Sequence, residues 1–103
     1  MKILILGDVM GASGRNVLNK KLRKLIKEKE IEFVIVNGEN AADDGRGITK
    51  NIAEKFFEIG VDVITSGNHI WDKQETTNYI DLEKRLLRPA NLAEGSPGRG
   101  HEI

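Results

Sequence analysis

Three short apolar runs at nearly equal intervals constrain the fold of this chain more than any other feature. They are Ile3–Gly7, Phe33–Val36 and Val61–Thr65. The first two are continuous rather than alternating and rich in β-branched residues, which is typical of strands in a parallel sheet covered on both faces. The third alternates at Asp62, which we place at the entry of the strand.

The two segments between these runs carry the periodicity of amphipathic helices. We expect Ser13 or Asn16 to cap the first helix, Thr49 to cap the second, and Gly60 to follow the end of the second. The predicted order is therefore β-α-β-α-β. Because crossovers between parallel strands are right-handed, all three strands should lie in one parallel sheet of an α/β fold. The apolar positions are Leu18, Leu22, Leu25 and Ile26, then Ile52, Ala53, Phe56 and Phe57.

Composition narrows the functional classes. The 103 residues suffice for one domain, and equal counts of 16 basic and 16 acidic residues argue against a nucleic-acid binder that acts by counterion release. We interpret the lysines of the first helix as a solvated face rather than a strong nucleic-acid patch, because Glu28, Glu30 and Glu32 follow closely. There is no cysteine for disulfides or thiolate metal sites. The first apolar run is too short for a signal peptide or a membrane span, so we expect a cytoplasmic protein without a membrane partner.

Oxygen-bearing side chains follow each apolar run, beside a glycine. Asp8 follows the first run, Glu39 and Asn40 follow the second, and Asn68 follows the third. Ligands of open parallel sheets bind at the carboxyl ends of the strands, so we expect these side chains to converge. Carboxylate and amide oxygens suit a hard or borderline divalent cation, which would also remove the repulsion between two carboxylates.

Each of these residues also has a purely structural interpretation. Asp8 could cap a helix, Asn40 and Asn68 could form turns, and His69 could pack or bind a carbonyl. Rival motifs are absent: the glycines lack the G-x-G-x-x-G spacing, and there is no P-loop. A Rossmann-like nucleotide binder without metal remains an alternative.

Four segments together resemble a known family: GDVMG, NGENAADDGRGI, GVDVITSGNHIWD and LLRPANLAEGSPGRG. They are similar to the bacterial calcineurin-like metallophosphoesterases of the 2′,3′-cyclic-nucleotide 2′-phosphodiesterase type, in the order found in that family. The resemblance implies the βαβαβ parallel-sheet half of a metallophosphoesterase sandwich. It also implies a hydrolase whose substrate is a small phosphodiester or cyclic nucleotide.

The resemblance further implies a role for each strand-end residue. Two divalent ions would activate a water, with iron or manganese expected first and zinc or magnesium as alternatives. Asp8 would bind one ion, Glu39 would bridge both, Asn40 would bind beside it, and Asn68 would bind the second. His69 would donate a proton to the leaving oxygen, a task that suits an imidazole near neutral pH.

One departure from the family concerns length. Family members are longer and supply further metal-binding histidines from a second half. We therefore expect residues 1–103 to be the N-terminal portion of a single metallophosphoesterase domain, apparently truncated, with an exposed sheet edge and apolar face. Such a chain should be inactive alone, and could form a homo-oligomer or associate with the missing C-terminal half. The alternative is a non-catalytic interaction or assembly module derived from the same fold.

Overall fold

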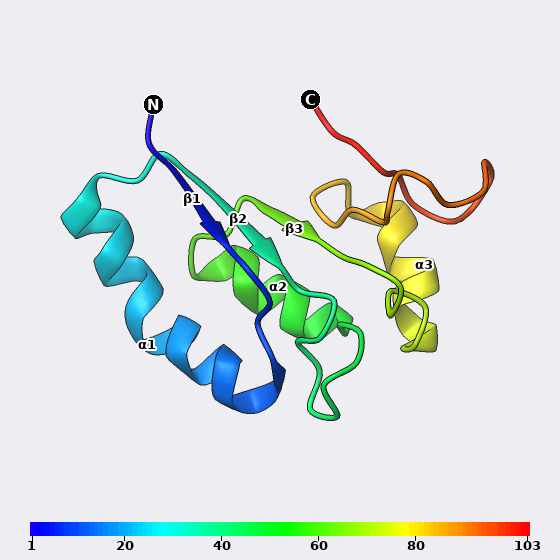
Figure 1. Cartoon of the computed structure of the whole chain (residues 1–103), viewed down its shortest axis with the longest axis horizontal. Coiled ribbons are helices and arrows are strands. Elements are labelled where there is room, and N and C mark those ends of the chain that lie inside the picture. Colours follow the sequence, from blue (N-terminus) through cyan, green and yellow to red (C-terminus); the bar gives the residue numbers. More distant parts are fainter.

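Three parallel strands in the order β1-β2-β3 form one sheet (Figure 1). The computed structural model describes residues 1–103. The α/β fold and the β-α-β-α-β order predicted from the apolar runs are confirmed, and one further helix follows. The elements are β1 (Ile3–Leu6), α1 (Gly11–Lys29), β2 (Phe33–Asn37), α2 (Lys50–Glu58), β3 (Val63–Thr65) and α3 (Gln74–Leu82).

The two outer strands of the sheet end differently. The outer edge of β3 is paired, because Ile64 N–H donates to the Arg85 carbonyl at 2.8 Å and Leu87 N–H donates to the Ile64 carbonyl at 2.9 Å. This segment after α3 runs parallel to β3 through a single bridge between Ile64 and Leu86. The outer edge of β1 pairs with no other strand. The chain therefore closes one edge of its sheet and leaves the other open.

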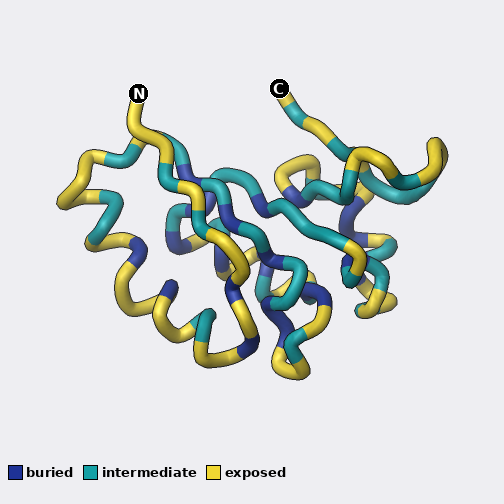
Figure 2. Tube along the Cα trace, in the orientation of Figure 1, coloured by how far each residue is buried: buried dark blue, intermediate teal, exposed yellow.

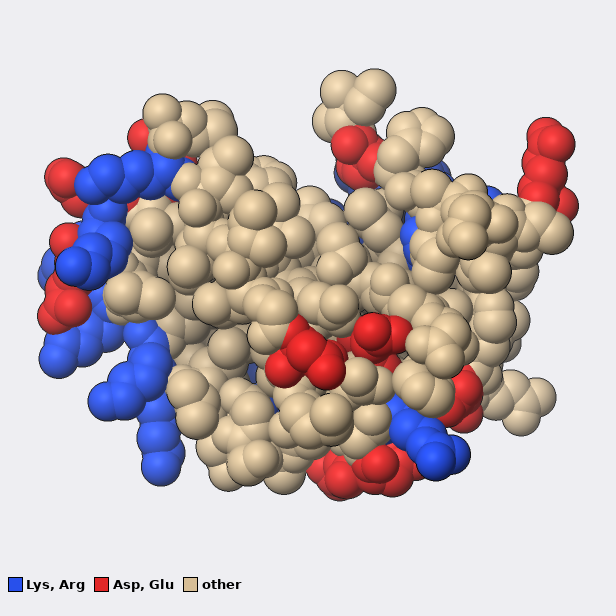
Figure 3. Space-filling view, in the orientation of Figure 1, with Lys and Arg blue, Asp and Glu red and all other residues tan.

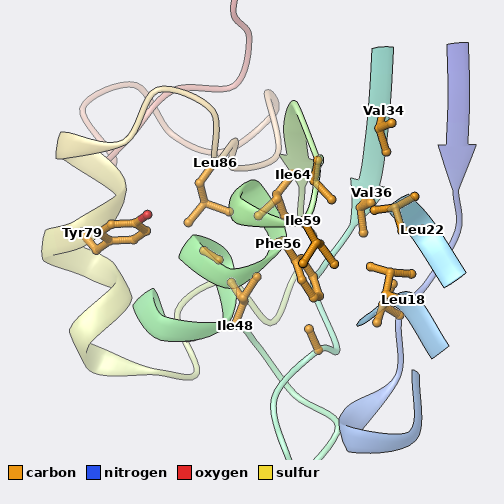
Figure 4. Packing of buried hydrophobic residues seen from close by; sticks show 14 of the residues in the cluster. Leu18, Leu22, Val34, Val36, Ile48, Phe56, Ile59, Ile64, Tyr79 and Leu86 are labelled. Atoms are coloured by element: carbon orange, nitrogen blue, oxygen red, sulfur yellow. The ribbon is translucent and has the colours of Figure 1, made fainter. Parts of the chain in front are cut away.

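The core lies between the sheet and the helices α1 and α2. Both crossovers step across the sheet in the same direction, so right-handedness puts both helices on the same face. Figure 4 shows their apolar side chains pointing at the side chains of β2. The buried residues at this contact are Leu18 and Leu22 of α1, Phe56 of α2 with Ile59 beyond its end, and Val34 and Val36 of β2.

The opposite face of the sheet is apolar and uncovered. Ile3 is 50% exposed and Ile5 is 71% exposed, whereas Leu4 and Leu6 pack against the core, and Figure 2 shows exposed and intermediate residues alternating along β1. The prediction that the strands are covered on both faces is wrong for this chain, because both helices lie on one side. The exposed edge and face expected from the family resemblance are present.

The residues that the sequence predicted at the boundaries of α2 and β3 lie at those boundaries in the structure. The Thr49 hydroxyl accepts the Ile52 N–H at 3.2 Å and so caps α2. Gly60 follows the helix with a φ of 115°, which glycine adopts without the strain that other residues would suffer. Asp62 precedes β3, and its carboxylate accepts the Val34 N–H at 2.8 Å. These bonds set where the second βα unit begins and ends.

The start of α1 differs from the prediction. The helix begins at Gly11, and the residue before it, Met10, makes no capping bond through its side chain. Ser13 and Asn16 lie within the helix rather than at its cap. The Gly11 N–H is instead satisfied by the Asn40 carbonyl at 2.9 Å. A tertiary bond to the loop after β2 thus replaces the expected cap.

Beyond β3, the chain forms one further helix, α3. Residues 88–103 form turns and bends without a helix or strand, as their proline and glycine content predicts. No helix of the chain combines the length and the hydropathy needed to cross a lipid bilayer.

Candidate active site

The loops that follow the three strands are joined at the carboxyl edge of the sheet. Val9 N–H donates to the Asn37 carbonyl at 3.2 Å, which ties the first loop to the end of β2. Gly38 N–H donates to the Thr65 carbonyl at 2.9 Å, which ties the second loop to the end of β3. The polar side chains carried by these loops are therefore held near one another, as parallel pairing requires.

Asp8 and Asn40 are in direct contact. The Asn40 Nδ2 lies 3.1 Å from Asp8 Oδ1 and 3.0 Å from Asp8 Oδ2, so one amide donates to both carboxylate oxygens. Asp8 is exposed, and Asn40 is half-buried. The Asn40 side-chain oxygen would have to turn toward a cation in order to bind it, since the amide nitrogen now faces the carboxylate.

The backbone N–H and carbonyl of Glu39 are both hydrogen-bonded, whereas one oxygen of its side chain has no partner. Its N–H donates to Asn37 Oδ1 at 3.0 Å, and its carbonyl accepts the Gly47 N–H at 2.5 Å. The carboxylate atom Oε2 is buried and has no hydrogen-bond partner. A β-carbon built on Gly67 would lie 2.6 Å from Glu39 Cδ, so this carboxylate packs directly against the backbone of the third loop. An unpaired buried carboxylate oxygen is costly unless a cation or a proton compensates it.

The third loop carries Asn68 and His69. Asn68 is exposed. His69 Nδ1 lies 3.0 Å from Asp72 Oδ2, with the two side chains 32% and 34% exposed. The Asp72 N–H also donates to the His69 carbonyl at 3.0 Å, which closes a turn and fixes the spacing of the pair. A carboxylate on Nδ1 leaves Nε2 as the free nitrogen of the imidazole.

The sequence did not predict the role of Asp72, although its position three residues after His69 within a turn is a signal that could have indicated it. Two ion pairs were also missed. Lys73 Nζ lies 2.7 Å from Asp44 Oδ2, which links the second loop to the third. The Lys73 ammonium holds the pKa of the Asp44 carboxyl below its usual range, with help from the Arg46 N–H.

The second missed pair anchors the second loop to α1. Arg15 Nη1 donates to the Ala41 carbonyl at 2.5 Å, and Arg15 Nη2 lies 2.5 Å from Asp43 Oδ1. The Arg15 side chain is only 20% exposed. Because Ala41 directly follows Asn40, this guanidinium restrains the segment that presents Glu39 and Asn40.

The structure therefore brings Asp8, Asn40 and Glu39 to one edge and places Asn68 and His69 on the adjacent loop. Nowhere in the chain do three or more histidine, cysteine, aspartate or glutamate side chains cluster in a way that could hold a metal ion. The oxygen donors present, together with the unpaired Glu39 Oε2, fit part of the shell of a hard divalent cation and leave positions to be filled. The predicted metal-binding and proton-donating roles stay predictions.

Comparison with known proteins identifies the family. Residues 4–103 match the family described as YmdB-like protein, so the chain belongs to the YmdB-like family. The chain is 46% identical over 100 residues to the 2′,3′-cyclic-nucleotide 2′-phosphodiesterase of Bacillus subtilis (strain 168). The match covers 97% of this chain and 38% of that protein.

Solved structures agree with this assignment. A crystal structure of a novel phosphatase of Mycoplasma pneumoniae matches with a TM-score of 0.88 and 34% identity, over 100% of this chain and 39% of that one. A hypothetical protein from Thermus thermophilus matches with a TM-score of 0.87 and 34% identity, over 100% of this chain and 40% of that one. The chain thus spans about two fifths of the length of the relatives it matches. The resemblance inferred from the four sequence segments is confirmed.

Proposed function

We propose that this chain supplies one part of the active site of a phosphodiesterase that hydrolyses 2′,3′-cyclic nucleotides or similar small phosphodiesters. The observation that carries this proposal is the unpaired, buried Oε2 of Glu39, which lies in the same strand-end loop as Asn40, whose side-chain amide contacts Asp8. Such an arrangement suits a site that receives a cation. The name of the Bacillus subtilis relative supports the choice of substrate.

The strand-end residues divide into two groups in this proposal. Asp8, Glu39, Asn40 and Asn68 would bind divalent ions, with iron or manganese expected first. When bound, such ions polarise the phosphate and lower the pKa of an attacking water. Glu39 would contribute to holding both ions, because its carboxylate lies between the second and third loops, against Gly67.

His69 is the proton donor to the leaving ribose oxygen. An alkoxide is a poor leaving group, so a proton delivered at the free Nε2 lowers the barrier. Asp72 holds the ring through Nδ1 at 3.0 Å and so fixes the direction in which Nε2 points. Asp72 acts through His69 and needs no contact with the substrate.

The remainder of the domain would cover the apolar face of the sheet. Ile3 and Ile5 are exposed on that face, and β1 has an unpaired edge. This chain covers 38% and 39% of the length of two relatives, so more than half of each relative lies outside the match. We propose that residues 1–103 form the N-terminal portion of a single metallophosphoesterase domain, and that the missing ligands and the cover of this face come from a second portion.

The experiment follows hydrolysis of 2′,3′-cyclic AMP by the longest polypeptide that carries this sequence, with Mn²⁺ or Fe²⁺ added and with a chelator. Turnover that requires metal supports the proposal. Absence of metal-stimulated turnover in that polypeptide would show that the enzymatic assignment is wrong. Metal content of the purified protein is measured in parallel, so that loss of activity and loss of metal can be separated.

A non-catalytic assembly module is the second candidate. It is favoured by one observation, the lack of any cluster of three acidic, histidine or cysteine side chains within this chain. Metal analysis of the longest polypeptide that carries this sequence decides between the two, because the phosphodiesterase proposal takes its remaining ligands from outside residues 1–103. Stoichiometric metal that is lost in Glu39→Ala counts against a purely structural role, and complete absence of metal binding supports it.

A further inference from the structure

One helix carries a large share of the positive charge of the chain. Of the 16 basic residues, seven lie in α1, together with one acidic residue, Glu28. Figure 3 shows basic side chains gathered over α1, on the left of the view. Although the net charge of the chain is zero, its basic residues are therefore concentrated on α1. The seven residues are Arg15, Lys20, Lys21, Arg23, Lys24, Lys27 and Lys29.

Four of these residues form a ladder on the exposed side of α1, which we call the basic face. Lys20, Arg23, Lys24 and Lys27 recur at intervals of three and four, so their side chains project from neighbouring turns. All four are exposed. With about 1.5 Å of rise per residue, the ladder extends for about 10 Å along the helix.

Glu30 and Glu32, which favoured a merely solvated face in the sequence, form no ion pair with the basic face. Lys24 lies 3.8 Å from Glu28 in an exposed pair, which contributes little energy. Arg23 donates to the Glu58 backbone carbonyl at 3.1 Å and keeps its charge unpaired. Lys20 and Lys27 form no ion pair. Further basic residues flank the face, because Lys2 reaches the last turn of the helix by donating to the Lys29 carbonyl.

The helix that carries the basic face begins beside the candidate active site. α1 begins at Gly11, whose N–H is bonded to the Asn40 carbonyl beside Asp8. Lys20 lies about 14 Å further along the same helix at the standard rise. A polyanion whose end occupies the site could therefore follow α1 with its backbone charges facing these lysines.

We propose that the basic face binds the phosphate backbone of single-stranded RNA whose 3′ end carries a 2′,3′-cyclic phosphate. This rests on the proposed function for the choice of RNA, because a 2′,3′-cyclic phosphate forms when the 2′-hydroxyl of a ribose attacks the adjacent phosphodiester of an RNA chain and the 5′-hydroxyl of the next nucleotide leaves. The cyclic ends of RNA would then be substrates alongside free cyclic nucleotides. Lysine ladders bind such backbones without reading sequence.

The observations favour RNA over an anionic membrane. Membrane-surface helices combine a basic face with a large apolar face that enters the lipid. In α1 the apolar side, Leu18 and Leu22, is buried in the core, and Val17 is the one large apolar residue exposed along the helix. Val17 alone does not make an apolar face that could enter lipid.

The test measures binding of a labelled oligouridylate ending in a 2′,3′-cyclic phosphate, by fluorescence anisotropy in chelator, so that no hydrolysis is needed. Four phosphate contacts predict a slope of log affinity against log salt of about −3, at about 0.7 per phosphate of a single strand. Replacing Lys20, Lys24 and Lys27 by glutamine should flatten the slope to about −0.7 and weaken binding about tenfold or more at low salt. Glutamine keeps the helix propensity close to that of lysine.

The matched control removes the same charge elsewhere, through Lys50→Gln, Lys84→Gln and Arg99→Gln, all exposed and outside α1. The control should bind RNA like the parent chain. The inference is wrong if both triple variants lose RNA affinity equally. It is also wrong if the α1 variant binds RNA as tightly as the parent chain does. Binding to phosphatidylglycerol vesicles in place of RNA also overturns it.

Turnover of 2′,3′-cyclic AMP separates this inference from the proposed function. The α1 variant should hydrolyse the mononucleotide at the parent rate, since none of its changes touches the site. If the parent chain hydrolyses 2′,3′-cyclic AMP but does not bind RNA, the proposed role of the basic face is wrong and the proposed function stands. RNA binding with no hydrolysis under any metal condition overturns the phosphodiesterase and leaves the surface standing.

Discussion

Replacing Gly67 by alanine tests whether the position of the Glu39 carboxylate matters for activity. The new β-carbon would overlap Glu39 Oε2 and would lie 2.6 Å from Cδ. Ordinary contact begins at 3.4 Å, so Cδ must move by at least 0.8 Å, and Oε2 must move further. Gly67 does not have a positive φ, which means that alanine fits its backbone conformation and the clash with Glu39 is the main effect.

The effects on stability and on the site should differ in size. The Glu39 carboxylate is the end of a flexible side chain, and an off-rotamer shift costs about 0.5–1.5 kcal/mol. The free energy of unfolding should fall by no more than that amount. A displacement approaching 1 Å of a group that positions reactants lowers turnover by about 100-fold. Affinity for Mn²⁺ should fall together with turnover.

Urea unfolding, followed through Trp71 fluorescence, gives the stability, and hydrolysis of 2′,3′-cyclic AMP gives the activity. Gly7→Ala is the matched control, because it also follows a strand and its β-carbon would meet no atom within 4 Å. Equal turnover and equal Mn²⁺ affinity in the two variants would refute the reasoning that Glu39 must hold its present position.

Three further predictions concern single residues. His69→Ala should lower turnover by about 10²–10⁴-fold, as expected for a general acid, with metal content nearly unchanged, whereas metal loss equal to that of Glu39→Ala would make His69 a ligand. Burial raises the pKa of Tyr79 to about 12, from an ordinary value of 10.0. The unfolded chain therefore loses this proton first, and stability should fall by about 2–3 kcal/mol between about pH 10 and pH 12. Tyr79→Phe should abolish that loss. Because the Tyr79 hydroxyl has no hydrogen-bond partner, the substitution should not destabilise the chain at neutral pH. The same fall in stability between about pH 10 and pH 12 in the parent and in the variant would contradict this. Thr49→Ala removes the cap of α2 and should cost about 1 kcal/mol in urea unfolding, and no change would show that the cap bond is not formed in solution.

The strands and helices were predictable because their signals are local. Each strand is an apolar run bounded by polar or glycine residues, and each crossover helix carries an apolar stripe. The cap of α2 at Thr49 is a bond between residues three apart. The start of α1 was missed because the Gly11 N–H is satisfied by Asn40, a contact that only the folded sheet creates.

Coverage of the sheet was mispredicted for a related reason. A continuous apolar run shows that both faces of a strand are suited to burial, but it does not show which residues cover them. In this chain α1 and α2 cover one face, and Ile3 and Ile5 remain exposed on the other.

The types of residue at the strand ends were predictable, and their contacts were not. Strand-end placement indicated Asp8, Glu39 and Asn68 as neighbours along one edge. The unpaired Glu39 Oε2 and the pairing of His69 with Asp72 depend on side-chain rotamers and loop packing, which leave no periodic trace in the sequence. Segregation of charge along α1 was likewise invisible in the net charge.

Turnover of 2′,3′-cyclic AMP by the longest polypeptide that carries this sequence, compared with its Glu39→Gln variant, tests the central claim most directly. Glutamine preserves the shape of the side chain and removes the charge that would hold a cation. We predict Mn²⁺- or Fe²⁺-dependent hydrolysis in the parent and a loss of about 100-fold or more, together with metal binding, in the variant. Hydrolysis that is equal in parent and variant, and unchanged by a chelator, would contradict a metal-dependent phosphodiesterase site built on Glu39.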